Sequence, residues 1–156
     1  EESQGFSTLA SFMGGERPKK PKKRKVSYTQ LRQFLQQVPT HTLYAFGNKL
    51  GVIVPLVANL VATHHRVIVF GRYQKMLCIV DECLERKGIS TLHFNGQLST
   101  SQRNESLVQF KEGDTRVLLV TVGAGGEGIT IVEADRVIII DPNWNPTVDD
   151  QAIDRA

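Results

Sequence analysis

The run Arg66-Val67-Ile68-Val69-Phe70 decides the fold, because it is a continuous apolar segment rich in β-branched residues, as in a buried strand. Three runs of similar character follow it, at residues 91–94, 116–122 and 136–140. Their apolar residues are continuous rather than alternating, and the longer runs are bounded by turn residues. Such runs predict four strands buried on both faces, which is typical of a parallel sheet.

Two segments between these runs have helical periodicity. Residues 73–87 form an amphipathic stretch that Gly88 closes, and residues 99–111 form another that Ser99 caps. A strand and a helix thus alternate with a repeat of about 20–25 residues, which requires crossovers between parallel strands. The sequence predicts an α/β fold, namely a three-layer domain with a mostly parallel sheet.

Upstream of the first strand the apolar residues also follow helical spacing. Residues 28–38 predict one helix, with Pro39 as a stop, and residues 49–62 predict a second, strongly apolar helix with a kink at Pro55. Residues 27–47 therefore form a helical connector ahead of the strand-rich part.

The first 26 residues have a different composition and predict a disordered basic linker or tail. They hold seven Lys and Arg against three Glu, which gives +4, whereas the other 130 residues carry a net charge of −1. The basic run, residues 19–25, resembles a viral-type nuclear import signal, with Lys22, Lys23, Arg24 and Lys25 at its centre. A contact with nucleic acid and a solvated linker or tag remain the alternatives for the same run.

Composition excludes several classes of protein. A length of 156 residues suits one domain, and the chain has no apolar run of the roughly 20 residues that a membrane span needs. It opens without a signal peptide, and its two cysteines exclude a disulfide framework and a four-cysteine zinc site. No metal ligands are predicted. Because the chain lacks an initial Met and stops abruptly, we expect a piece of a longer protein.

One acidic pair imitates a magnesium site. Asp81 and Glu82 follow an apolar run, as in the magnesium-holding strand of nucleotide hydrolases, but the chain contains no G-x-x-x-x-G-K-[ST] phosphate loop. The apolar residues from Met76 to Lys87 instead occupy one face of a helix, with Asp81, Glu82 and Glu85 turned away from it. The helical interpretation is the stronger one.

A glycine run imitates a dinucleotide-binding loop. Residues 123–128 match G-x-G-x-x-G after a predicted strand, and Asp141 stands at about the position expected for a ribose-binding acid. Only seven residues, 129–135, separate the last glycine from the next strand, too few for a crossover helix. A dinucleotide-binding oxidoreductase remains the alternative enzyme class. The glycines would still let backbone N–H groups approach a phosphate closely.

Several segments, taken together, resemble the Swi/Snf-type ATPases of helicase superfamily two. Residues 117–130 resemble motif V, residues 150–156 resemble the opening of motif VI, and residues 67–70 resemble motif IV. Residues 93–96 with Arg103 resemble the segment that follows motif IV. Between motifs V and VI stands a further signature of the family, Asp141-Pro142-Asn143-Trp144-Asn145-Pro146. The resemblance covers about residues 48–156.

The resemblance implies a RecA-like second motor lobe over residues 48–156, incomplete at its C-terminus. ATP with Mg²⁺ would lie between it and the first lobe of the same protein, which would hold the magnesium. Arg155 would be the catalytic arginine that reaches the γ-phosphate, and Gly126, Gly128 and Gln151 would line the ATP cleft. The residues implied to contact DNA are Arg72, Thr121, Gly123, Ala124, Gly125 and Trp144.

This chain departs from the family pattern at several positions. Gly71 and Arg72 stand where motif IV usually has Ser and Gln, and Gly123 stands where Lys or Arg usually precedes Ala-Gly-Gly. The implied function is a lobe of an ATP-dependent double-stranded-DNA translocase or chromatin remodeller, nuclear and not membrane-bound, with nucleosomes as a further partner. The chain alone would be inactive as an ATPase. A non-catalytic docking lobe is the remaining alternative.

Overall fold

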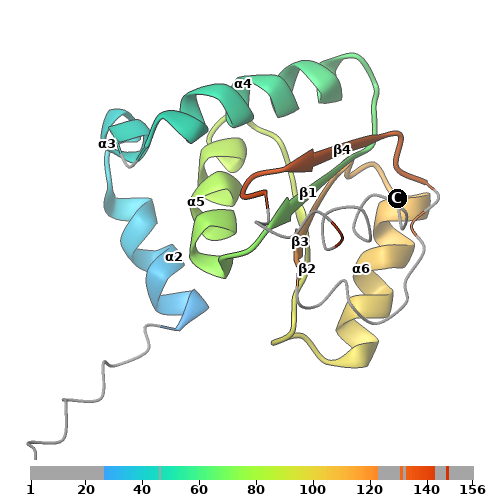
Figure 1. Cartoon of the computed structure of the whole chain (residues 1–156). Helices are drawn as coiled ribbons and strands as arrows, with labels where there is room; N and C mark the ends of the chain where they lie inside the picture. The colour runs from blue at the N-terminus through green and yellow to red at the C-terminus, as the bar shows by residue number, and fades with distance from the viewer. Residues whose placement is uncertain (1–26, 46, 123–130, 132, 143–146, 148–156) are drawn as a thin grey trace, which may run out of the picture.

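The computed structural model describes residues 27–45, 47–122, 131, 133–142 and 147 (Figure 1). Within these residues, helices precede and alternate with parallel strands. In chain order the elements are α2 (Tyr28–Gln37), α3 (Thr40–Ala45), α4 (Asn48–Ala62), β1 (Val67–Gly71), α5 (Gln74–Glu85), β2 (Leu92–Phe94), α6 (Thr100–Glu112), β3 (Val117–Thr121) and β4 (Arg136–Ile139).

The four described strands form one sheet in the order β2-β3-β1-β4. All three neighbouring pairs are parallel, and Val67 of β1 is in register with Val117 of β3 and with Arg136 of β4. The predicted α/β fold with a mostly parallel sheet is therefore confirmed. The strands all end at one edge of the sheet, which we call the carboxyl edge.

The prediction that all four strands are buried on both faces is wrong for two of them. Every residue of the central strand β1 is buried, and so are the first four of β3. In contrast, β2 and β4 are the two outer strands of the described sheet, each with a neighbouring strand on one side only. Most residues of β4 are half-buried, and Arg136 is exposed. Continuous apolar runs occur in central and edge strands alike, so the runs alone do not reveal strand order.

Two hydrophobic clusters lie on opposite faces of the sheet. On one face, Val67 and Val69 pack with apolar residues of α4 and α5. On the other face, Ile68 and Phe70 pack with Phe110 of α6. This alternation along β1 produces the three layers that the sequence predicts. Figure 1 shows α4 and α5 on one side of the sheet and α6 on the other.

The helices upstream of the sheet belong to the same core. Ser27 caps α2 through a capping box with Gln30, and Leu35 of α2 and Leu43 of α3 are both buried in the cluster around α5. The short helix α3 was not expected, because Pro39 indicated a stop. The Pro39 carbonyl instead accepts hydrogen bonds from Thr42 and Leu43, and thus starts α3.

The remaining local predictions agree closely with the structure. Ser99 caps α6 with Gln102, and Gly88 adopts the left-handed conformation (φ = 74°) just after α5 ends. Helix α4 continues through Pro55. None of the described helices is long and apolar enough to cross a membrane.

Candidate functional site

The carboxyl edge brings together two of the predicted DNA-contacting residues. Arg72 directly follows β1, and Thr121 is the last residue of β3, in register with Gly71. The Val122 amide donates to the Gly71 carbonyl across 3.2 Å, so the two strands stay paired to the point where both predicted contacts begin. Ligands of open parallel sheets bind outside the carboxyl ends of the strands. The described part of the site is therefore located where a ligand is expected.

All of the other predicted site residues lie outside the described residues. For the DNA contacts these are Gly123, Ala124, Gly125 and Trp144, for the ATP cleft Gly126, Gly128 and Gln151, and for catalysis Arg155. The import residues Lys22, Lys23, Arg24 and Lys25 also lie outside them. Their roles stay predictions.

Arg72 is exposed at this edge and available to an anionic ligand. Its guanidinium carbon lies 5.9 Å from the centre of the Tyr73 ring, which is itself 61% exposed. Within the described residues no carboxylate pairs with Arg72. An arginine held against an aromatic ring keeps its hydrogen-bond donors free for a phosphate.

The glycine that precedes Arg72 is required by packing. A Cβ atom at Gly71 would lie 2.8 Å from Cγ and Cδ2 of Leu77, and Leu77 is only 2% exposed. Real Cβ atoms do not approach other atoms so closely, so a serine here would displace a core leucine of α5. This contact explains why the chain has glycine where motif IV usually has serine.

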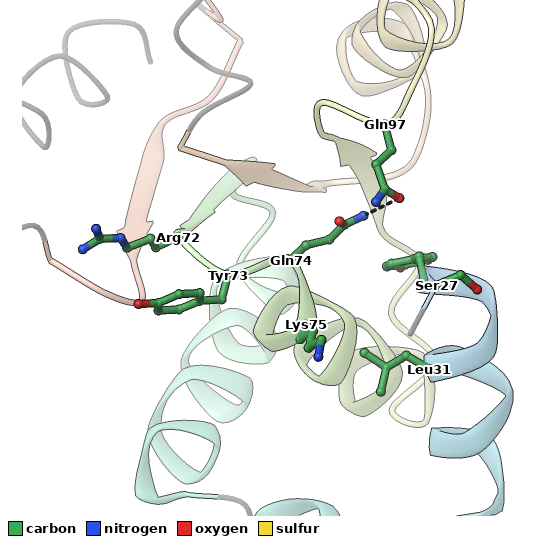
Figure 2. Close-up of a pocket in the computed structure, with 8 residues that line it drawn as sticks. Ser27, Leu31, Arg72, Tyr73, Gln74, Lys75 and Gln97 are labelled. Carbon is green, nitrogen blue, oxygen red and sulfur yellow. Dashed lines mark hydrogen bonds between the residues drawn. The ribbon is translucent and has the colours of Figure 1, made fainter. Parts of the chain in front are cut away.

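A cavity of about 290 Å³ opens beside Arg72 (Figure 2). The side chains of Gln74 and Gln97 are hydrogen-bonded across 3.1 Å at its wall. The lining contains two cations and no carboxylate. The residues that line it are Ser27, Tyr28, Leu31, Arg72, Tyr73, Gln74, Lys75 and Gln97. The sequence did not indicate that the start of α2 would reach this edge.

The acid that the dinucleotide pattern would assign to a ribose has another partner. Asp141 follows β4, and its Oδ1 accepts a charged hydrogen bond from Lys49 at the start of α4. Its Oδ2 is buried and has no hydrogen-bond partner among the described residues. The structure thus ties the beginning of the Asp-Pro-x-Trp-Asn-Pro segment to α4.

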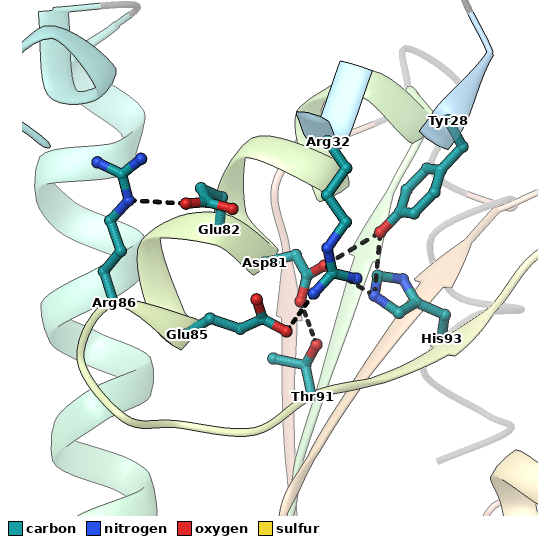
Figure 3. Close-up of polar contacts among 8 residues, drawn as sticks. All are labelled: Tyr28, Arg32, Asp81, Glu82, Glu85, Arg86, Thr91 and His93. Carbon is teal, nitrogen blue, oxygen red and sulfur yellow. Dashed lines mark hydrogen bonds and ion pairs between the residues drawn. The ribbon is translucent and has the colours of Figure 1, made fainter. Parts of the chain in front are cut away.

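Asp81 lies at the centre of a buried polar cluster (Figure 3). It is on helix α5, which confirms the helical interpretation, but the prediction that Asp81 and Glu82 turn away from the packed side of the helix is wrong, because both are buried and the Asp81 side chain is only 1% exposed. Its Oδ2 accepts from the Tyr28 hydroxyl at 3.0 Å and contacts His93 Nε2 at 3.0 Å, while its Oδ1 accepts from Thr91. Because a carboxylate only accepts, the His93 contact requires a hydrogen on Nε2.

The cluster also ties α2 to α5 through charge. Arg32 of α2 lies 3.5 Å from Asp81 Oδ2 and donates to Glu85. Burial raises the pKa of Asp81, but the hydrogen bonds and charges of His93, Thr91 and Arg32 outweigh it and leave that pKa below its ordinary value. Every oxygen of Asp81 thus has a donor, so this carboxylate stabilises the fold and does not await a metal. Among the described residues there is no group of three or more His, Cys, Asp or Glu side chains placed to hold a metal ion.

The partner of Tyr28 gives a testable pH dependence. Burial and the Asp81 carboxylate raise the Tyr28 pKa far above its ordinary value of 10.0. A raised folded-state pKa contributes stability below pH 10 that is lost as the pH rises further. The free energy of unfolding should therefore fall by about 1 kcal/mol more in the wild type than in Tyr28→Phe between pH 9 and pH 11. Parallel falls, measured by urea unfolding, would contradict the buried position of the hydroxyl.

The chain is similar to proteins of the helicase and chromatin-remodelling class. The model of the helicase conserved C-terminal domain matches residues 48–156. Protein CHROMATIN REMODELING 24 of Arabidopsis thaliana is 39% identical over 109 residues, which are 69% of this chain and 10% of that protein. DNA excision repair protein ERCC-6-like of Danio rerio is 35% identical over 124 residues, 78% of this chain and 8% of that protein.

The fold has a close match among solved structures. The C-terminal part of the Fun30 ATPase domain superposes with a TM-score of 0.72 and 25% identity, over 82% of this chain and 44% of that chain. The chain spans about a tenth of the length of the curated relatives it matches. From the match over residues 48–156 and the shared fold, the chain belongs to the helicase conserved C-terminal domain family, and the ATPases it resembles there are of the SNF2 (Swi/Snf) type.

Proposed function

We propose that residues 48–156 are the second motor lobe of an ATP-dependent double-stranded-DNA translocase or chromatin remodeller, preceded by a helical connector at 27–47 and a basic linker at 1–26. The observation that carries the proposal is the family match over the whole strand-rich part, with Arg72 and Thr121 together at its carboxyl edge. Phosphate contacts position a protein on DNA, and arginine and hydroxyl side chains provide them.

In this proposal the two sides of the lobe have different tasks. The phosphates of one DNA strand are held by the side chains of Arg72 and Thr121 and by the backbone N–H groups of Gly123, Ala124 and Gly125. Trp144 lies beside the same strand. Gly126, Gly128 and Gln151 line the ATP cleft, and Arg155 stabilises the charge that develops on the γ-phosphate. When bound, ATP with Mg²⁺ supplies the phosphoryl group, and the first lobe of the same protein holds the metal. The location is nuclear, as befits relatives named for chromatin remodelling and DNA repair, with nucleosomes as a further partner.

The 156-residue chain should bind DNA but hydrolyse no ATP, since it contains no phosphate loop. We expect ATP turnover at background level with and without duplex DNA, while the chain shifts a short duplex in a binding assay. Arg72→Ala should weaken that binding, whereas Lys87→Ala, which removes an exposed charge beyond the far end of α5, should not. ATP turnover that survives further purification would contradict a two-lobe motor. If both variants bind the duplex as tightly as the wild type, Arg72 is not one of the DNA contacts.

A further inference from the structure

The start of α2 lies at the carboxyl edge of the sheet, beside the residues proposed to hold DNA. Ser27, the capping residue of α2, lines the same cavity as Arg72 and Lys75 (Figure 2). The sequence alone placed no part of residues 1–47 near this edge.

The first and last turns of α2 are both fixed to α5. Near its start, Tyr28 donates to the buried Asp81, and Arg32 bridges Asp81 and Glu85 (Figure 3). Near its end, the Arg86 guanidinium donates to the Leu35 carbonyl across 2.8 Å. Because α2 is held at both ends, the position of Ser27 relative to Arg72 is a fixed property of the fold.

This anchor limits where the basic run can be. Lys25 stands two positions before Ser27 and Lys19 stands eight positions before it, so at full extension their Cα atoms lie within about 7 Å and about 29 Å of the Ser27 Cα atom. All six cations of the run are thereby confined to a distance from the cavity comparable to one turn of B-form DNA, about 34 Å.

The residues that line the cavity carry charge of a single sign. The sequence contains no Asp or Glu between Arg17 and Val80, a segment that includes the basic run, Arg72 and Lys75. The run cannot pair with the cavity, because both are cationic and repel each other. A polyanion, in contrast, attracts the basic run and the cavity at the same time. A DNA duplex is such a polyanion, with one phosphate charge per about 1.7 Å of its axis.

We infer that the basic run of residues 19–25 contacts the same DNA duplex as the carboxyl edge, as an additional phosphate-binding element of the lobe. The inference rests on the proposed function, because it takes the carboxyl edge to face DNA. It gives the run a role at the motor itself, in addition to any role in nuclear import.

The test is the salt dependence of duplex binding by the 156-residue chain. Each phosphate contact lowers the slope of log K against log salt by about 0.9. Changing Lys22, Lys23, Arg24 and Lys25 to Ala should reduce the magnitude of the slope by about 2 to 4 and weaken binding tenfold or more near 0.1 M salt. The control is Lys87→Ala combined with Lys111→Ala, two exposed lysines on other parts of the surface, which should leave the slope within about 0.5 of the wild type.

Arg72→Ala, measured in the same series, separates this inference from the proposed function. A smaller slope for the four-alanine variant, together with weaker binding of Arg72→Ala, supports both. An unchanged slope with weaker binding of Arg72→Ala overturns the inference and leaves the proposed function standing, and the run then serves import or linkage only. A smaller slope with normal binding by Arg72→Ala overturns the inference, because the run would then bind DNA without Arg72 at the carboxyl edge, and it removes Arg72 from the DNA contacts of the proposed function.

Discussion

Arg155→Ala is expected to lower the kcat of the intact motor by roughly 10²-fold or more, which corresponds to about 2.7 kcal/mol of lost transition-state stabilisation. In the proposed motor, Arg155 is the motif VI arginine, whose rigid guanidinium would stabilise the negative charge that develops on the γ-phosphate. Comparable arginine fingers contribute about 10³–10⁵ in rate. The measurement is DNA-saturated ATP turnover by the protein that includes both lobes.

Two further variants make the assignment of Arg155 specific. Arg155→Lys keeps the charge but loses the planar fork, so its kcat should lie between those of the wild type and Arg155→Ala. Gly125→Val should have the opposite phenotype, because a side chain there blocks close approach of the backbone to a DNA phosphate and leaves ATP turnover without DNA largely intact. All variants must melt at the wild-type temperature. Weaker DNA binding by Arg155→Ala with a normal kcat would mean that the catalytic arginine is another residue.

The fold was predictable because its signals are local. The period of about 20–25 residues, the continuous runs and the caps at Ser99 and Gly88 each depend on neighbouring residues, and the parallel sheet follows from them. Strand order was not predictable, because Arg136–Ile139 has the composition of a central strand but lies at an edge. Helix α3 was not predictable, because six residues are too few to show a periodic pattern. In addition, Pro39 does more than end α2, since its carbonyl accepts the first hydrogen bonds of α3.

The candidate site was predictable only in part, because its described half depends on contacts between distant segments. Motif likeness pointed to Arg72 and Thr121, and the pairing of β1 with β3 brings them to one edge. No sequence pattern showed that Ser27 would line a cavity with Arg72, since they are 45 residues apart and α2 packs there through a buried carboxylate. The departure at Gly71 likewise becomes intelligible only from its contact with Leu77.

Asp81→Ala is expected to destabilise the chain by about 2–4 kcal/mol, because the substitution removes the centre of the buried polar cluster. The carboxylate is 1% exposed and accepts from Tyr28 and Thr91, so its removal deprives these two half-buried hydroxyl groups of their shared acceptor. It also removes the partner that joins α2 to β2 through His93. Urea unfolding should show the loss as a lower midpoint with a nearly unchanged slope.

Glu85→Gln is the matched control for Asp81, because both carboxylates contact Arg32 but Glu85 is 40% exposed. An exposed ion pair contributes about 0–1 kcal/mol, so the free energy of unfolding of this variant should lie within about 1 kcal/mol of the wild-type value.

The pH dependence of stability gives an independent measure of the Asp81 contribution. Because the Asp81 pKa is lowered in the folded state, its contribution is present above about pH 4 and is lost as the pH falls further. Asp81→Asn should therefore lose less stability than the wild type on acidification below pH 4, and its starting stability should already be lower. Equal costs for Asp81→Ala and Glu85→Gln would show that α2 is held to α5 by its apolar contacts at Leu35 and Leu31 and not by the buried carboxylate.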